Sequence, residues 1–158
     1  ITSGNKWQYI SWAKSVDGVG DAKCLPLWNG AGTVKVIIVD SEKQLAGSEL
    51  INKVQSYIDE QCPIGADVTV TTATAVSINV TFSADVDEST IESIKSNIRS
   101  YLRDVSFANG YVSYAKIGQT ILNTDGVDDY SNLKINSKTE NITISETEIA
   151  VLGGVAVG

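Results

Sequence analysis

Histidine is absent from the 158-residue chain, and this absence excludes several kinds of chemistry at once. Histidine most often activates a serine or cysteine nucleophile, and it is the commonest metal ligand. Carboxylates could still act in pairs, since Glu146 and Glu148 would share one face of an extended segment. Asp128 and Asp129 also adjoin Asp125. Because acidic side chains are ordinarily exposed, we interpret all five as solvated groups and expect no catalytic residue.

Cysteine is scarce, and the chain has only Cys24 and Cys62. Two cysteines this far apart fit neither a zinc site nor a redox motif. They could form a disulfide bond, although nothing in the sequence requires one. We interpret them as two buried apolar thiols, which weakly favours a reducing compartment.

Two short motifs resemble ligand-binding loops but lack essential residues. Residues 123–132 have part of the spacing of a calcium loop, yet Ile121 would be its first ligand and Asn132 its last. The charged first ligand and the bidentate glutamate are therefore missing. Gly30 and Gly32 precede a predicted strand, so no helix dipole lies behind them to hold a phosphate. The sequence thus predicts no metal, no cofactor and no small-molecule substrate.

Long hydrophobic runs and clusters of positive charge are missing as well. No apolar run approaches the ~18 residues that cross a bilayer, and no secretory leader begins the chain. The 12 Lys and Arg residues are dispersed, and 19 Asp and Glu residues bring the net charge to −7. Since nonspecific nucleic-acid binding depends on clustered basic residues, we expect neither nucleic acid nor membrane as a partner. Ile1 is no natural start, so we expect the chain to begin partway through a longer protein.

What is present is the composition of a soluble globular protein, with 42% hydrophobic residues. The spacing predicts a first helix over residues 6–16, capped by Asn5. Its apolar contacts are expected from Trp7, Ile10, Ala13 and Trp12.

A glycine-rich corner at residues 29–32 joins a predicted pair of strands. In the second strand, over residues 33–40, the even-numbered apolar residues from Val34 to Ile38 alternate with the rest, which is typical of a half-buried strand. Pro26 has no N–H to donate, so the first strand should be an edge strand or should bulge at that point.

A 3.6-residue stripe then predicts a helix over residues 48–60, stopped at Cys62-Pro63. From residue 67 to residue 85 the apolar residues keep even positions throughout, as in a strand. One strand of that length would span roughly 60 Å, which is too long for a small sheet. Residues 71–75, in the middle, are therefore either a crossover between two lobes or a turn within one lobe. Because these residues are small and polar, we favour the crossover and place the lobe boundary near Ala75.

The second lobe is predicted to open with a strand over residues 76–82 and a helix over residues 88–104. Ser89 and Glu92 have the spacing of a capping box at the start of this helix. A shorter helix is predicted over residues 113–123. Three short strands should follow, marked by alternation at Leu133 and Ile135, at Ile142 and Ile144, and in the apolar tail over residues 149–157.

Both lobes mix amphipathic helices with mostly hairpin-linked strands, which favours an α+β fold over a doubly wound sheet. We therefore predict two small mixed lobes, residues 1–74 and residues 75–158, that fold around separate cores.

Several ordered stretches, taken together, resemble one protein family. They are SVDGVGDAKCLPLWNGAGTVKVIIVD near the start, GADVTV in the middle, and TDGVDDYSNLKIN with ITISETEIAVLGGV at the end. On these stretches the chain resembles the middle and C-terminal parts of the baseplate J family of contractile phage tails, the family of the Mu-like baseplate assembly protein. The resemblance spans nearly the whole chain. Ala31 and Ala46 stand where family members often have proline. Neither change affects a catalytic residue, because the family is structural.

The resemblance implies a structural protein of a phage or prophage tail. Such a protein is a wedge component that builds the inner ring of the baseplate. Its partners would be other wedge proteins and copies of itself, and it would lie in the virion tail baseplate after assembly in the bacterial host cytoplasm. The resemblance implies no catalytic residue and no cofactor.

Two other functions remain open from the residues alone. A binding module of a secreted or surface protein would need an export signal, and a carboxylate-based hydrolase would need a cleft that raises a carboxyl pKa. For a wedge protein we expect exposed contact surfaces at Pro26, Leu27 and Trp28 and at Tyr130. The alternative for Trp28 is that its ring closes the core of the first lobe.

Overall fold

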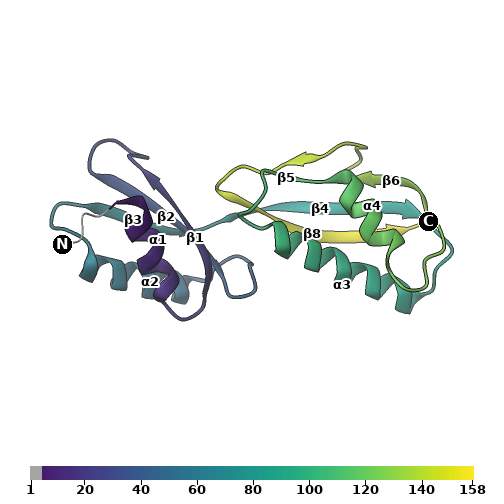
Figure 1. The fold of residues 1–158 in the computed structure, drawn as a ribbon, viewed down its shortest axis with the longest axis horizontal. Coiled ribbons are helices and arrows are strands. Elements are labelled where there is room, and N and C mark those ends of the chain that lie inside the picture. The colour runs from purple at the N-terminus through teal and green to yellow at the C-terminus, as the bar shows by residue number, and fades with distance from the viewer. Residues whose placement is uncertain (1–4) are drawn as a thin grey trace. The chain divides into compact units, whose positions relative to one another are not determined.

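The structure is a computed structural model that describes residues 5–158, with four helices and eight strands in that range (Figure 1). The chain packs as two compact units, which divide between Thr74 and Ala75. Helices and short mixed sheets occur in both units, so the prediction of an α+β fold is confirmed. None of the described helices is long and apolar enough to cross a membrane.

The first unit contains one three-stranded sheet and two helices. Its elements are α1 (Lys6–Ser15), β1 (Val19–Pro26), β2 (Thr33–Asp40), α2 (Ser48–Gln61) and β3 (Asp67–Thr72). The strand order is β1-β2-β3. β1 and β2 form an antiparallel hairpin, whereas β2 and β3 run parallel and α2 makes the crossover between them. The expectation of mostly hairpin-linked strands is therefore wrong here, because sequence periodicity does not reveal which strands become neighbours.

Helix α1 begins where the side chain of Asn5 accepts the backbone N–H of Gln8 at 2.9 Å, as predicted. Its buried face consists of Tyr9, Trp12 and Ala13, and the two aromatic rings meet edge to face with centroids 5.4 Å apart. Trp7, expected in the core, is 77% exposed. The three aromatic residues cannot all lie on one helical stripe, and residues 9, 12, 13 and 16 form the stripe that faces the sheet.

Strand β2 is the central strand, and this position explains a second difference from the prediction. Residues 36 to 39 are all buried, so the strand is not half-buried over its second half. The edge position of β1, with Pro26 as its last residue, is as predicted. The irregularity in its pairing lies instead between Val19 and Asp21. Gly20 sits there because a Cβ would collide with the carbonyl oxygen of Asp40.

The second unit carries seven elements in two small sheets. They are β4 (Thr74–Ser83), α3 (Glu88–Val105), β5 (Tyr111–Val112), α4 (Tyr114–Leu122), β6 (Ser131–Ile135), β7 (Ile142–Thr143) and β8 (Glu148–Val157). One sheet has the order β6-β4-β8, and β5 pairs with β7. Again the neighbours of β4 are strands distant in sequence. The last strand begins one residue before the predicted stretch, residues 149–157, and ends with it.

The core of the second unit lies between the β6-β4-β8 sheet and two helices. Alternate residues of β4, namely Ile78, Val80 and Phe82, pack against the buried residues of both α3 and α4. Both helices therefore cover the same face of the sheet. The opposite face carries Ser77, Asn79 and Thr81, which are polar and exposed.

The predicted bounds of α3 are confirmed within one residue, but its cap differs from the prediction. Asp87 is the N-cap, and its carboxylate accepts the N–H of Thr90 at 2.8 Å and the hydroxyl of Ser89 at 3.1 Å. Ser89 therefore lies inside the first turn and does not begin a capping box with Glu92. An aspartate two residues earlier is an equally good cap, and it lets the helix start sooner.

Candidate interaction surfaces

The first predicted surface lies in the turn between β1 and β2. Strand β1 ends at Pro26, and the next residue, Leu27, donates its N–H to the carbonyl oxygen of Thr33 at 2.7 Å. Leu27 has a φ of 59°, in the left-handed region that a residue with a Cβ seldom adopts. Its side chain is 65% exposed. The turn therefore holds a leucine outward in an unfavourable backbone conformation.

Thr33 holds this turn together with its hydroxyl group. Its Oγ1 accepts the N–H of Asn29 at 3.0 Å and donates to the carbonyl oxygen of Gly30 at 2.7 Å. Trp28 lies on the turn so constrained, 44% exposed, with Nζ of Lys35 at 4.9 Å from its ring centroid. The ring is absent from the buried core of the first unit. The alternative in which Trp28 closes that core is therefore wrong.

A third exposed residue near this turn was missed by the sequence analysis. Ile64 is fully exposed in the loop that joins α2 to β3. The loop leads into β3, whose first residue, Asp67, donates its N–H to the carbonyl oxygen of Gly32 at 3.0 Å, so the loop and the turn lie at the same end of the sheet. Its exposure could have been predicted from its place between Pro63 and Gly65, since such a turn sequence puts a side chain outside the helices and strands. We name Pro26, Leu27, Trp28 and Ile64 the turn patch.

Tyr130 has a different environment from the one expected. Its ring meets Phe82 edge to face, with centroids 6.3 Å apart, and it packs against the core of the second unit. Its hydroxyl lies against Gly118 of α4, where a Cβ would collide with it. The backbone N–H is accepted by the carboxylate of Asp129 at 2.9 Å. The ring therefore contributes to the core and is only half-exposed.

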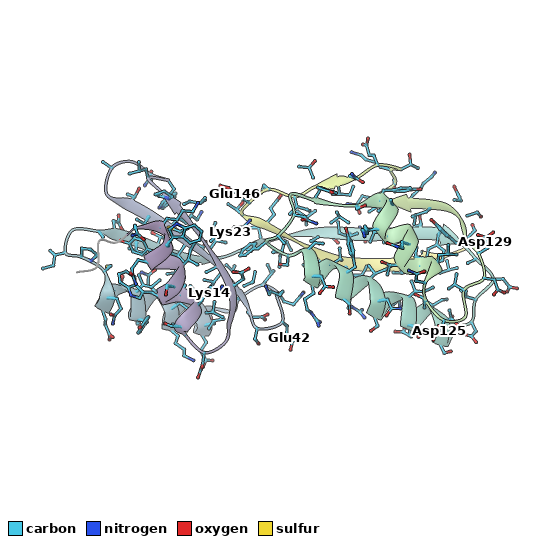
Figure 2. The ribbon with its side chains drawn as sticks, in the orientation of Figure 1. Lys14, Lys23, Glu42, Asp125, Asp129 and Glu146 are labelled. Atoms are coloured by element: carbon cyan, nitrogen blue, oxygen red, sulfur yellow. The ribbon has the colours of Figure 1, made fainter. Side chains whose placement is uncertain are left out.

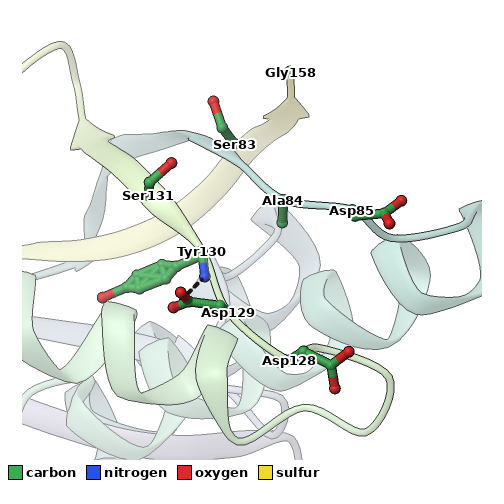
Figure 3. A pocket seen from close by; sticks show the side chains of 8 residues that line it. All are labelled: Ser83, Ala84, Asp85, Asp128, Asp129, Tyr130, Ser131 and Gly158. Carbon is green, nitrogen blue, oxygen red and sulfur yellow. Dashed lines mark hydrogen bonds between the residues drawn. The ribbon is translucent and has the colours of Figure 1, made fainter.

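Beside Tyr130 lies an open groove of about 580 Å³ (Figure 3). It is lined by Asp85, Asp128 and Asp129 together with small residues from the ends of β4, β6 and β8. The carboxylates do not converge on one point, since that of Asp129 turns toward the N–H of Tyr130. Within residues 5–158 no group of three His, Cys, Asp or Glu side chains is placed to hold a metal ion.

The other carboxylates weighed for catalysis are dispersed. Glu146 lies at the opposite end of the second unit from Asp125 and Asp129 (Figure 2). Glu148 accepts the N–H of Ser145 at 2.9 Å and so closes a turn. Residues 144–147 lie outside any strand, hence the extended segment that would align Glu146 with Glu148 does not form.

The two cysteines are unpaired thiols, as we predicted. Cys24 is buried, and Cys62 is only half-buried at the end of α2. Burial raises the pKa of the Cys24 thiol, and nearby Lys6 opposes this effect. Burial also raises the pKa of Cys62, with Asp59 acting in the same direction. Neither environment promotes the reactive thiolate.

Three curated relatives match almost the whole chain. Phage-like element PBSX protein XkdT of Bacillus subtilis (strain 168) is 38% identical over 98% of the chain and 48% of its own length. Uncharacterized protein YqbT of the same strain matches with equal identity and coverage. Baseplate protein gp47 of Escherichia phage Mu is 24% identical over 96% of the chain and 45% of its own length. The chain thus spans about half the length of these curated relatives.

The fold also occurs in a solved assembly. A chain in the cryo-EM structure of the anti-feeding prophage (AFP) baseplate, 6-fold symmetrised, superposes with a TM-score of 0.68 over 96% of this chain and 37% of that chain. Its sequence identity is 7%, so this likeness concerns the fold. The domain described as Baseplate J-like central domain matches residues 1–72, and the domain described as Baseplate J-like protein C-terminal domain matches residues 74–158. Two consecutive domains of one family therefore account for nearly every residue, and the chain belongs to the baseplate J-like family.

Proposed function

We propose that the chain is a structural component of a contractile phage or prophage tail baseplate, in the wedge or inner ring. The observation that carries this proposal is the match of both baseplate J-like domains, in order, to the two compact units. The 38% identity to a protein of a phage-like element supports it. The dispersed carboxylates and the absence of histidine fit a role without catalysis.

The turn patch is the surface we assign to partner contact. It exposes large apolar side chains on a turn that hydrogen bonds constrain, so little conformational entropy would be lost when a partner covers it. Tryptophan is enriched among the residues that dominate interface energies. Tyr130 is the weaker candidate of the four sequence-predicted residues, because its ring already packs in the core.

The partners we propose are other baseplate wedge proteins and further copies of this chain, not nucleic acid, membrane or a small-molecule substrate. The place of action would be the tail baseplate, with assembly in the bacterial host cytoplasm. The dispersed basic residues and the net charge of −7 support the exclusion of nucleic acid.

Complementation with Trp28→Ala tests this function. A host whose own copy of the gene is deleted would receive the wild-type gene, the variant, or the control Leu122→Ala. Leu122 is 46% exposed, much like Trp28, but lies in the second unit. We expect baseplates and complete tails from wild type and control, and a loss of assembled baseplates with Trp28→Ala. Complete tails from the deletion strain itself would contradict the baseplate role, whereas normal assembly with Trp28→Ala would contradict only the turn patch.

A further inference from the structure

Every sheet edge is a row of backbone groups that could pair with another strand, and folded proteins usually block such edges. In the first unit, β3 is blocked by a side chain of α2. Gln55 Nε2 donates to the carbonyl oxygen of Val68 at 2.9 Å, and Gln55 Oε1 accepts the N–H of Val70 at 2.8 Å. The amide group of Gln55 thus occupies the place that a further strand would take.

The edge strand β1 is protected in another way. Pro26 has no N–H to offer, and the N–H of Ala22 is accepted by the carboxylate of Asp21 at 2.8 Å. Asp21 also lies 3.5 Å from Nζ of Lys43 and 3.9 Å from Nζ of Lys14, so charged groups flank this edge. Proline and charge are both common devices that prevent strand addition.

The edge of β6 in the second unit is also occupied. The hydroxyl of Tyr114, from α4, donates to the carbonyl oxygen of Leu133. Beyond it the chain turns back, and Ile135 and Lys138 exchange two backbone hydrogen bonds of 2.8 and 3.0 Å. Three of the four edges of the two larger sheets are therefore closed by local contacts.

Strand β8 is the remaining edge, and it has none of these protections. Residues 149–158 contain no charged residue and no proline. In the part of the chain that the structure describes, no side chain bonds to the backbone of residues 149–157 as Gln55 does to β3. A long edge strand whose one charged residue, Glu148, lies at its end is a template for strand pairing.

The apolar layer of the second unit is also incomplete on the β8 side. On the central strand β4, Ile78, Val80 and Phe82 are at most 3% exposed. On β8, the residues that pack on the same core remain half-exposed, namely Leu152, Val155 and Val157. Side chains from one more strand would cover them, as β8 itself covers those of β4.

We propose that β8 pairs with β8 of a second copy of this chain, in antiparallel orientation, and joins the two three-stranded sheets into one. Such a pair sets no like charges opposite each other, since the strand's charged residue, Glu148, lies at its end. Each copy would supply the half-exposed side chains that the other lacks. Because β6 is closed, the β6-β4-β8 sheet has one open edge, and a two-fold contact uses it in both copies and stops at a dimer.

This inference rests on the proposed contact between copies and assigns it a place. Its test is the oligomeric state of the 158-residue chain alone. In a two-fold antiparallel pair centred on β8, residues 151–154 of one copy run beside the same residues of the other. The variant Val151→Lys/Gly154→Lys therefore brings four lysines together in the middle of the paired strands, where like charges repel. A Cβ at Gly154 has its nearest neighbour at 3.9 Å, so the monomer has room for the change.

The matched control is Ser77→Lys/Thr81→Lys, which adds the same charge to exposed positions of the central strand β4. Light scattering after gel filtration, over about a hundredfold range of protein concentration, gives the molar mass. We expect the wild type and the control to approach twice the monomer mass at high concentration, and the edge variant to remain a monomer with an unchanged melt. A wild type that stays monomeric, or an edge variant that still dimerises, overturns the strand pairing and leaves the baseplate role intact.

Hydrogen exchange of the wild type gives a second measurement that needs no variant. We expect the outward-facing amides of residues 149–157 to exchange about tenfold more slowly in concentrated than in dilute protein, while the amides of β3 do not change. If the edge variant fails to fold, this comparison decides the question. Equal exchange of the β8 amides at both concentrations overturns the proposal.

Discussion

Gln55 is bonded to the N–H of Val70 through its side-chain carbonyl oxygen, at 2.8 Å, as a neighbouring strand would be. The same side chain bonds to the carbonyl oxygen of Val68 and to the carboxylate of Asp59. One residue of the helix therefore ties α2 directly to the backbone of β3. The pairing is long-range in sequence, and periodicity cannot reveal it because Gln55 belongs to no apolar stripe.

Replacing Gln55 with alanine should destabilise the first unit. Two hydrogen bonds to the backbone of β3 are lost, which corresponds to about 1–3 kcal/mol in the free energy of unfolding. Urea denaturation followed by circular dichroism measures the difference. Gln44→Ala is a suitable control because the amide group of Gln44 bonds only to its own loop, at 3.2 and 3.4 Å. A variant as stable as the control would show that water replaces both bonds without loss.

The cap of α3 should make the start of this helix sensitive to acid. The backbone N–H of Thr90, followed by side-chain hydrogen bonds from Thr90 and Ser89, lowers the pKa of Asp87. A lowered pKa means that the stabilisation is present above the ordinary aspartate pKa and is lost as pH falls through the lowered value. We expect the NMR signals of the first turn of α3 to follow this titration. In Asp87→Asn the same signals should stay constant over that pH range, because the amide caps without titrating.

Gly118 and Tyr130 should be energetically coupled. A Cβ on Gly118 would collide with the Tyr130 hydroxyl and lie 3.3 Å from Cζ of the same ring. Overpacking of this kind costs about 1–3 kcal/mol, which outweighs the gain in helix propensity of alanine over glycine. We expect Gly118→Ala to lower the melting temperature and Tyr130→Phe to restore most of the loss. A double variant no more stable than Gly118→Ala would contradict this contact.

Separate folding of the two units stays a prediction, and expression of residues 75–158 alone tests it. This segment contains a complete set of core residues drawn from β4, α3, α4, β6 and β8. A core that needs no residue from the first unit should support a cooperative thermal transition. A molten or aggregated product would show that the second unit depends on the first.

Metal ions should leave the stability of the chain unchanged. The groove beside Tyr130 is lined by three aspartates, yet the carboxylates there do not converge. Thermal melts with calcium, with zinc and with EDTA should therefore coincide. A ligand at 100 times its Kd would stabilise the folded state by about 2.7 kcal/mol, which a melt detects easily. A shift of that size with either ion would contradict this prediction.

The helices and the family could be predicted from the sequence because both depend on which residues follow one another in short stretches of the chain. Asn5 begins α1, and the apolar stripe of α3 fixes its length within one residue. The side-chain environments were harder to predict. Trp7 and Trp12 occupy the same helix, and only contact with the sheet decides which of them is buried.

At the candidate surfaces, too, local features could be predicted from the sequence and long-range contacts could not. Pro26 predicted the edge strand and its end, since the missing N–H is a property of the residue itself. The half-burial of Tyr130 depends on Phe82 and Gly118, which are distant in sequence. The parallel pairing of β2 with β3 is also a long-range contact, and the periodicity of the sequence does not indicate it.

The exposure of Trp28 also gives the turn patch an optical signal. Trp12 is only 8% exposed, so its indole is already shielded from water, whereas the indole of Trp28 is 44% exposed. In a Trp7→Phe background, any protein that covers the turn patch should shift the fluorescence emission toward the blue through Trp28 alone. Docking at this surface could then be followed in real time without a label, and the emission of the unbound chain supplies the baseline.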